Sequence, residues 1–213
     1  MSVSPKIPAI CSHADSFHKE GITGKNITVA IMDSGLSPHP EIAPHRILHF
    51  HDFVYGRTTP YDDYSHGTHV TGIIGAKQIG IAPECSLIAL KILDHHGNCS
   101  IELFIEAIHW LLTHQYEYNI RIVNMSIGSN PSISRTEQIL LNLWVSRLWE
   151  AGLIVCCSAG NNGPTRNTIT APGNCEDIIT VGSCDGTSFS SISRIPSSKP
   201  EICAPGVRIL SLK

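Results

Sequence analysis

Short, nearly continuous apolar runs recur along this chain, and they leave it few possible architectures. The runs cover residues 27–32, 86–92, 120–125 and 153–157. Strands that are apolar on both faces are typical of parallel sheets, because helices cover both faces of such a sheet. These runs therefore predict a buried, mainly parallel sheet.

Two amphipathic segments lie between the later runs. The first is predicted to be a helix that begins at the cap residue Ser100 and carries apolar residues at three- and four-residue spacing as far as Leu112. The second is predicted to run from Thr136 to Ala151, with Gly152 as a stop. Its predicted apolar face holds Ile139, Leu140, Leu143, Trp144 and Leu148. Alternating strands and helices imply right-handed crossovers, so the predicted fold class is α/β, a doubly wound sheet with helices on both faces.

Size and composition exclude several functions. The chain has 213 residues, which suits one domain, and its net charge of -3 lacks the basic excess that nucleic-acid binding needs. No apolar run reaches the ~20 residues of a membrane span and no leader is evident, so we expect no membrane partner and a cytoplasmic location, with a longer secreted precursor as the alternative. The eight cysteines show no paired CxxC spacing, so we expect reduced thiols. Composition leaves the oligomeric state open.

The first motif, Asp33-Ser34-Gly35, directly follows an apolar run. Alone, this tripeptide is most simply a turn, in which Asp bonds nearby amides and Gly takes a positive φ. Asp33, Ser126 and Asn161 all lie at or just past the end of an apolar run. Doubly wound sheets place their sites at the carboxyl ends of strands, so these residues are candidates for one site.

The second motif, His66-Gly67-Thr68-His69-Val70, stands at an expected helix start. Its two histidines could ligate a metal, but a catalytic zinc needs a third protein ligand, and no residue stands at a characteristic spacing. Glycines at positions 67, 72 and 75 each disfavour a helix by about 1 kcal/mol relative to alanine. They indicate a helix that packs closely against the sheet beneath a substrate cleft.

The third motif, Ser158-Ala159-Gly160-Asn161-Asn162-Gly163, is alone equally consistent with a polar loop. In this order, however, the three motifs resemble those of the subtilisin-like serine proteases, the subtilase family. Further segments that resemble the family are residues 24–26, 80–83, 124–128 and 204–207. The resemblance implies an N-terminal segment over residues 1–23 and a peptidase domain over residues 24–213 that is incomplete at its C-terminus.

The resemblance also implies a role for each motif. Asp33 would orient His66 and stabilise its imidazolium, while His66 would act as the general base. His69 would be structural. Asn161 would donate its side-chain amide to the oxyanion of the tetrahedral intermediate.

A polypeptide substrate is implied in the same way. It would add as an extra strand between two edge segments, Gly97-Asn98-Cys99 and Ser126-Ile127-Gly128. Ser158, Ala159 and Gly160 would form one wall of the first side-chain pocket, with room for a large apolar residue. Cys99 and the preceding His95 and His96 depart from the family at this edge.

Two further departures bear on activity. The family's serine follows the segment that matches residues 204–207, and only Arg208 to Lys213 remain there, so the nucleophile is expected to be absent from these 213 residues. Ser188 has the right neighbours but stands too early. Residues 77–80 are shorter than the family's calcium loop and Glu41 replaces a usual Asp, so we expect no metal and no cofactor. The alternative to a serine endopeptidase is a non-catalytic, peptide-binding or regulatory member of the family.

Overall fold

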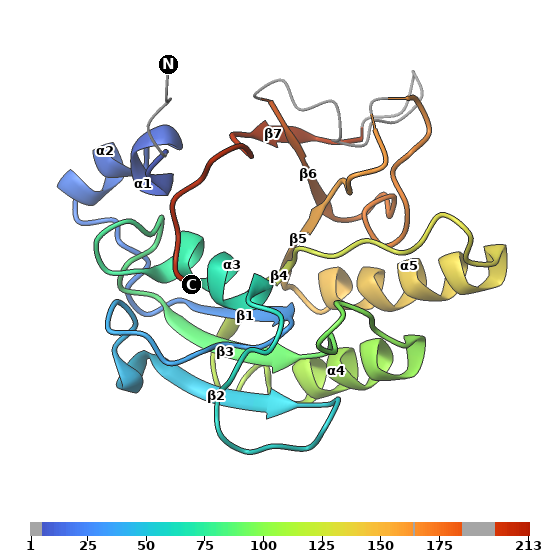
Figure 1. Cartoon of the computed structure of the whole chain (residues 1–213), viewed down its shortest axis with the longest axis horizontal. Helices are drawn as coiled ribbons and strands as arrows, with labels where there is room; N and C mark the ends of the chain where they lie inside the picture. The colour runs from blue at the N-terminus through green and yellow to red at the C-terminus, as the bar shows by residue number, and fades with distance from the viewer. Residues whose placement is uncertain (1–5, 164, 185–198) are drawn as a thin grey trace.

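The computed structural model describes residues 6–163, 165–184 and 199–213. Within these ranges, seven parallel strands form one sheet in the order β2-β3-β1-β4-β5-β6-β7 (Figure 1). The strands are β1 (Thr28–Asp33), β2 (Ile47–Asp52), β3 (Ser86–Lys91), β4 (Ile120–Met125), β5 (Ile154–Ser158), β6 (Ile179–Ser183) and β7 (Ile202–Ala204). The predicted doubly wound, mainly parallel sheet is confirmed.

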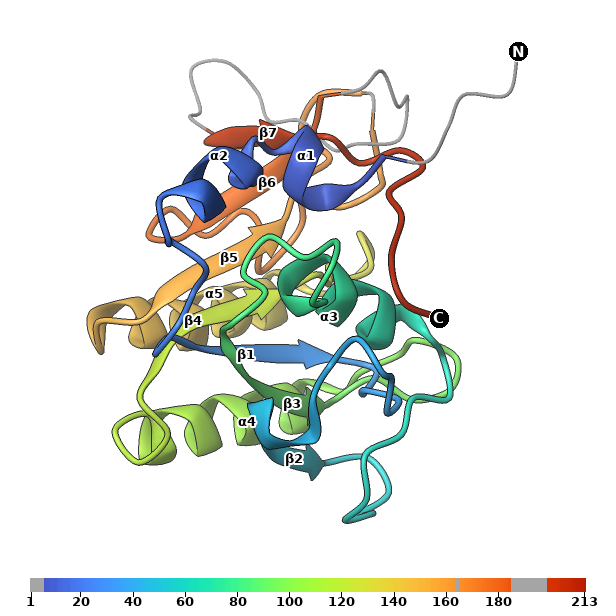
Figure 2. The same cartoon turned by 90° about the vertical axis from the view of Figure 1, so that its left-hand side faces the viewer.

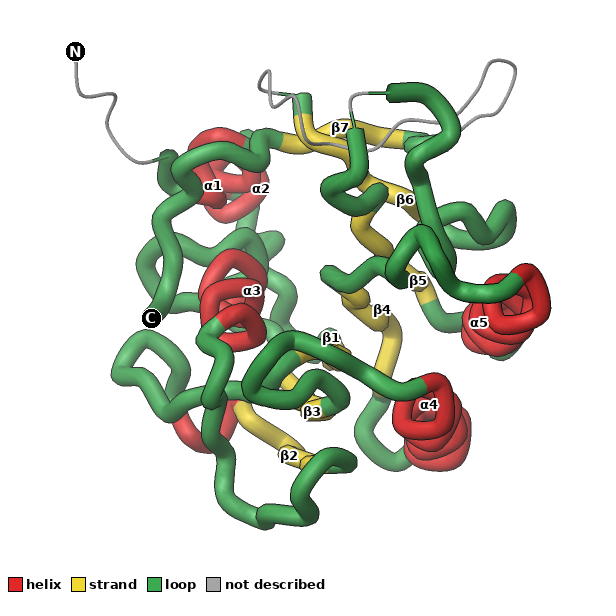
Figure 3. The backbone as a smooth tube through the Cα atoms, turned by 45° about the vertical axis from the view of Figure 1, so that its right-hand side comes forward, coloured by secondary structure: helices red, strands yellow, loops and turns green. Residues whose placement is uncertain are grey.

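Helices cover both faces of this sheet, as predicted. Figure 3 shows α4 and α5 on one face and α3 on the other. The helices are α1 (Pro8–Cys11), α2 (Ala14–Lys19), α3 (His66–Gly75), α4 (Ile101–His114) and α5 (Arg135–Glu150), with a 3-10 turn at Pro44–Arg46. Among the described residues, no helix is long and apolar enough to cross a membrane.

The two predicted helices form with small differences at their starts. Ser100 caps α4, and its hydroxyl accepts a hydrogen bond from the amide of Leu103 at 3.3 Å. α5 begins one residue earlier than predicted, because Ser134 and Glu137 form a capping box that satisfies amides at both positions. A serine followed three residues later by Glu was the signal for this start.

The predicted buried face of α5 was partly wrong. Ile139 and Leu143 are 60% and 49% exposed, whereas Leu141, Val145 and Leu148 are buried. The buried set has spacings of four and three residues, so it forms the stripe that packs on α4 and the sheet. The exposed pair lies two residues on either side of Leu141 and therefore on the opposite face of the helix.

Three strands were not predicted. β2 carries His49 and His51 between its apolar residues, so its sequence does not form an apolar run. It is also an edge strand, paired only with β3 in the described sheet. β6 and β7 are short, and apolar runs of that length give no clear signal.

The C-terminal end of the chain lies beside α3 (Figures 1 and 2). The Ser211 hydroxyl donates to the carbonyl of His69 at 2.5 Å, and Leu212 is buried against the core on this face. The predicted reason for the α3 glycines therefore needs a correction at Gly72. The atoms nearest to a Cβ at this position belong to Ser211 and Leu212 of this segment, and none of them to the sheet.

Candidate active site

Asp33 occupies the carboxyl end of β1 with its side chain 1% exposed. One carboxylate oxygen accepts a hydrogen bond from the Ser34 amide at 2.7 Å. The Asp33 carbonyl accepts from the amides of Ile92 and Leu93, just past the end of the neighbouring β3. The acid is thus fixed both by its own turn and by the sheet.

His66 is the first residue of α3, and its side chain is 42% exposed. Its Nδ1 lies 2.7 Å from Asp33 Oδ1 and 2.9 Å from Asp33 Oδ2. An ionised carboxylate only accepts hydrogen bonds, so Nδ1 carries the hydrogen and Nε2 is left to accept a proton. The hydrogen bond to Asp33 raises the pKa of His66 and outweighs the burial of the ring, which lowers it.

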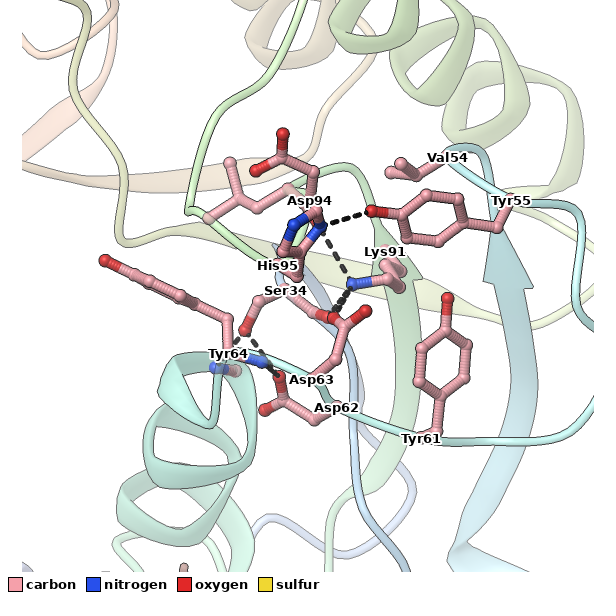
Figure 4. Close-up of polar contacts among 12 residues, drawn as sticks. Ser34, Val54, Tyr55, Tyr61, Asp62, Asp63, Tyr64, Lys91, Asp94 and His95 are labelled. Carbon is pink, nitrogen blue, oxygen red and sulfur yellow. Dashed lines mark hydrogen bonds and ion pairs between the residues drawn. The ribbon is translucent and has the colours of Figure 1, made fainter.

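The start of α3 is held by Asp62, a residue that the motif analysis missed. Ser65, at the N-cap position, has φ 69° and makes no cap with its own side chain. The Asp62 carboxylate instead accepts from the amides of Tyr64, Ser65 and Thr68 and from the Thr68 hydroxyl. It also accepts from the Ser34 hydroxyl at 2.8 Å, as Figure 4 shows. An Asp shortly before an expected helix start was the signal that could have found it.

The charge of Asp62 is stabilised by these contacts. Burial alone would raise its pKa, but the hydrogen bonds, above all those from Thr68, leave the pKa below its ordinary value. Ser34 in turn accepts from the Gly67 amide at 2.9 Å. The turn after Asp33 and the helix that carries His66 are therefore joined through Ser34 and Asp62.

Gly67 lets this helix approach the turn closely. A Cβ at this position would lie 2.2 Å from the Gly35 carbonyl oxygen and 3.2 Å from Asp33 Cβ. No side chain fits there, so glycine is required for the separation of Asp33 and His66. This agrees with the close packing predicted from the glycines of this helix.

A cleft of ≈ 520 Å³ lies beside His66. The two predicted edge segments, Gly97–Cys99 and Ser126–Gly128, both line it, and so does Asn161. The remaining wall is largely apolar and includes Leu93, Ile101, Phe104, Ile127, Ile133 and Leu141. The structure thus brings His66, Asn161 and both predicted edges to one cleft, with Asp33 buried behind His66.

Cys99 belongs to the wall of this cleft. Its thiol donates to the Ser100 carbonyl at 3.1 Å. Burial raises the pKa of the Cys99 thiol to about 12, so it stays protonated at neutral pH. A protonated thiol is a poor nucleophile.

A second hollow of ≈ 710 Å³ lies on the other side of Asn161, between α3 and the carboxyl ends of β5 and β6. Ser158, Ala159 and Gly160 line this hollow. Gly160 also comes near the first cleft, since a Cβ on Gly128 would lie 4.0 Å from its Cα. Ser188, the rejected nucleophile candidate, lies outside the described residues.

Glu41 hydrogen-bonds the loop over residues 77–80, where we expected no calcium. Its carboxylate accepts from the Gln78 amide at 2.8 Å, and its carbonyl accepts from the Lys77 amide at 3.0 Å. Among the described residues, no group of three His, Cys, Asp or Glu side chains is arranged to hold a metal ion. His69 is tied to the C-terminal segment through its carbonyl.

The site combines a buried carboxylate with the partly exposed histidine that it orients, and both lie at the carboxyl edge of a doubly wound sheet. Hydrolases that activate a nucleophile use this arrangement. Sequence comparison identifies the family. A model described as the Subtilase family matches residues 24–212, so the chain belongs to the subtilase family.

Individual relatives agree with this assignment. The chain is 36% identical over 228 residues to serine protease AprX of Bacillus subtilis (strain 168), covering 95% of this chain and 51% of AprX. It is 35% identical over 211 residues to subtilisin NAT of Bacillus subtilis subsp. natto, covering 93% and 51%. A solved cold adapted subtilisin-like serine proteinase superposes with a TM-score of 0.75 at 27% identity, covering 89% of this chain and 66% of that one. The chain spans about half the length of these curated relatives.

Proposed function

We propose that this chain is the greater part of the catalytic domain of a serine endopeptidase of the subtilisin type. The observation that carries the proposal is the hydrogen bond of 2.7 Å between Asp33 and His66 at the edge of a cleft that Asn161 also lines. A protein that only bound peptides would not need a buried carboxylate, the histidine that it orients and an amide donor at one cleft. The nucleophilic serine comes from a segment beyond these residues.

His66 moves the proton in each step. As the serine oxygen attacks the peptide carbonyl carbon, Nε2 takes the serine proton, and the carbonyl π electrons move onto the oxygen. Asp33 stabilises the resulting imidazolium through Nδ1. The proton then passes to the peptide nitrogen as the C–N bond breaks, which leaves an acyl-enzyme. Water attacks this ester in the same way, with His66 taking the proton of the water and returning it to the serine.

Asn161 supplies charge stabilisation in this scheme. Its amide would donate a hydrogen bond to the oxygen that becomes negative in the tetrahedral intermediate. Asn161 is exposed and lines both the cleft and the second hollow, so its amide is accessible to a substrate carbonyl in the cleft that His66 also lines.

The cleft favours an extended peptide with apolar side chains. Two segments, Gly97–Cys99 and Ser126–Gly128, offer backbone on its two sides, where a peptide could add as a strand. Phe104, Ile133 and Leu141 line its apolar part. A residue upstream of the cut that is large and apolar would therefore be preferred.

We propose that the segment carrying the serine occupies the second hollow. This hollow has an apolar lining that includes Ile73, Ile74, Cys156 and Val181, and it adjoins Asn161. A helix with one apolar face that carries a serine at its start would cover this lining, and its serine would lie near Asn161, which also lines the cleft beside His66.

Steady-state kinetics on a version extended to a serine downstream of Lys213 test the proposal. His66→Ala should lower kcat by about a millionfold, and Asp33→Asn should also be severe, because an amide favours the wrong tautomer. Asn161→Ala should lower kcat by about a hundred- to a thousandfold with little change in KM. A rise in KM alone would make Asn161 a substrate-binding residue. Peptide binding without turnover in the unmodified extended chain would favour the non-catalytic alternative.

A further inference from the structure

Lys91 carries a buried charge next to the candidate site. It ends β3 in register with Asp33 of β1, and its side chain is 0% exposed. Its Nζ donates to Asp63 Oδ1 at 2.6 Å and to the Ser34 carbonyl at 2.6 Å (Figure 4). It also donates to the Leu93 carbonyl at 2.8 Å. An ammonium has three donors, so all of them are used.

The three acceptors come from three different parts of the site. The Ser34 carbonyl belongs to the turn after Asp33. Asp63 belongs to the loop that leads into His66 and α3. Leu93 lines the cleft and begins the segment that continues to the substrate edge. One charged group therefore connects the acid, the base and the peptide-binding edge.

Asp62 makes a second connection beside the first. It binds the Ser34 hydroxyl, while Lys91 binds the Ser34 carbonyl. The neighbouring carboxylates of Asp62 and Asp63 thus hold the same loop to the same turn from two sides. The Asp33–His66 hydrogen bond spans this junction.

Two tyrosine rings lie over the Lys91 ammonium. The Lys91 nitrogen lies 5.1 Å from the ring centre of Tyr61 and 5.7 Å from that of Tyr55, within the range of cation–π attraction. The Tyr55 hydroxyl hydrogen-bonds His95 Nδ1 at 2.9 Å, which ties this cover to the substrate-edge loop. The rings lie over the Lys91 end of the pair, while the Asp63 carboxylate is 30% exposed.

We propose that the ion pair of Lys91 and Asp63 is a positioning device that sets the separation of Asp33 and His66. Lys91 touches neither substrate nor the histidine ring; it acts through the turn and the loop that carry the acid and the base. Its catalytic consequence rests on the proposed peptidase function, but the geometry it sets can be measured without turnover.

The test is an NMR titration of the His66 ring in the whole 213-residue chain. In Lys91→Met, the turn and the loop lose their common donor, so the hydrogen bond to Asp33 should lengthen. The titration midpoint of His66 should then fall toward the ordinary value of about 6.5. Asp63→Ala removes the partly exposed partner and should shift the midpoint in the same direction, and the shift should persist at about 1 M salt, where the direct effect of the lost charge is screened.

Arg46→Met is the matched control. Arg46 donates to the Gly75 and Cys85 carbonyls, so it holds the far end of the same helix. This variant should lose stability and keep the His66 midpoint. If Lys91→Met folds with an unchanged midpoint, the proposal is wrong. If Lys91→Met does not fold, Asp63→Ala decides by the same criterion.

Kinetics on the serine-bearing version separate this proposal from the proposed function. Lys91→Met should lower kcat more than it raises KM. The acid limb of its pH–rate profile should shift to lower pH by the same amount as the His66 titration midpoint. An extended chain without any turnover, combined with a shifted midpoint in Lys91→Met, would reject the peptidase and keep the positioning role. Turnover by the extended chain, combined with an unshifted His66 midpoint in Lys91→Met, would support the peptidase and reject the positioning role.

Discussion

Replacing Gly67 with alanine should separate the helix that carries His66 from the turn that carries Asp33. The new Cβ would lie 2.2 Å from the Gly35 carbonyl oxygen, 2.9 Å from the Gly35 nitrogen and 3.2 Å from Asp33 Cβ. A carbon and a carbonyl oxygen rest no closer than about 3.3 Å, so the helix and the turn must move apart by about 1 Å. The closest neighbours are backbone atoms, which cannot rotate away as a flexible side chain would.

The expected loss of stability follows from two opposing terms. Overpacking of a well-packed site costs about 1–3 kcal/mol, and the upper part of this range applies because backbone has to move. The better helix propensity of alanine returns about 1 kcal/mol. The net loss is about 2 kcal/mol, which lowers the Tm of a chain of this size by about 4–8 °C. The same movement should lower the pKa of His66, because it weakens the hydrogen bond to Asp33.

Thermal unfolding and the His66 titration can be measured on the same samples. Gly75→Ala is the control, because it lies in the same helix but its Cβ would meet the flexible end of Arg46 at 2.9 Å and the Cys85 sulfur at 3.4 Å. The control should keep the wild-type titration and lose little or no stability. A Gly67→Ala chain that melts at or above the wild-type temperature with an unchanged titration would refute the reasoning.

Three further predictions concern the surroundings of the site. Asp62→Ala should lower the free energy of unfolding by about 2 kcal/mol in a urea titration, because α3 loses its cap and Ser34 loses an acceptor; a loss within error would show that water replaces the carboxylate. Calcium should leave the Tm unchanged, and Glu41→Ala should lower the free energy of unfolding by about 1 kcal/mol because the hydrogen bond to the Gln78 amide is lost. A calcium-dependent rise in Tm that Glu41→Ala abolishes would reveal a metal site. The raised pKa of His66 contributes stability that is fully present below about pH 6.5 and is lost as the pH rises through the pKa of the folded chain. The difference in unfolding free energy between wild type and Asp33→Asn should therefore shrink as the pH rises over that interval. A difference that grew with pH would contradict the assignment.

The sheet, its two long helices and the residues of the acid–base pair could be predicted from sequence because each has a strong local signal. Apolar runs predict the buried strands, and Ser100 predicts the start of α4. Three short motifs located Asp33, His66 and Asn161, and the resemblance to the subtilase family, now shown, supplied their proposed roles.

The residues that hold the pair together had a weaker local signal or none. Lys91 ends an apolar run, where a lysine is normally taken as the exposed end of a strand. Its burial depends on Asp63 and on two carbonyls that are distant in sequence. Asp62 serves both the helix and the turn, and only the folded chain shows that these two meet. Tertiary contacts of this kind cannot be read from local pattern.

Covalent labelling with a fluorophosphonate, followed by intact-mass measurement, tests the proposed function most directly. The 213-residue chain should take no label, and Ser188 should stay unmodified. A version extended to a serine downstream of Lys213 should take one label on that serine, and His66→Ala should remove nearly all of the labelling rate, because the serine then lacks its base. Labelling of Ser188, no labelling of the extended chain, or labelling that survives His66→Ala would contradict the proposal.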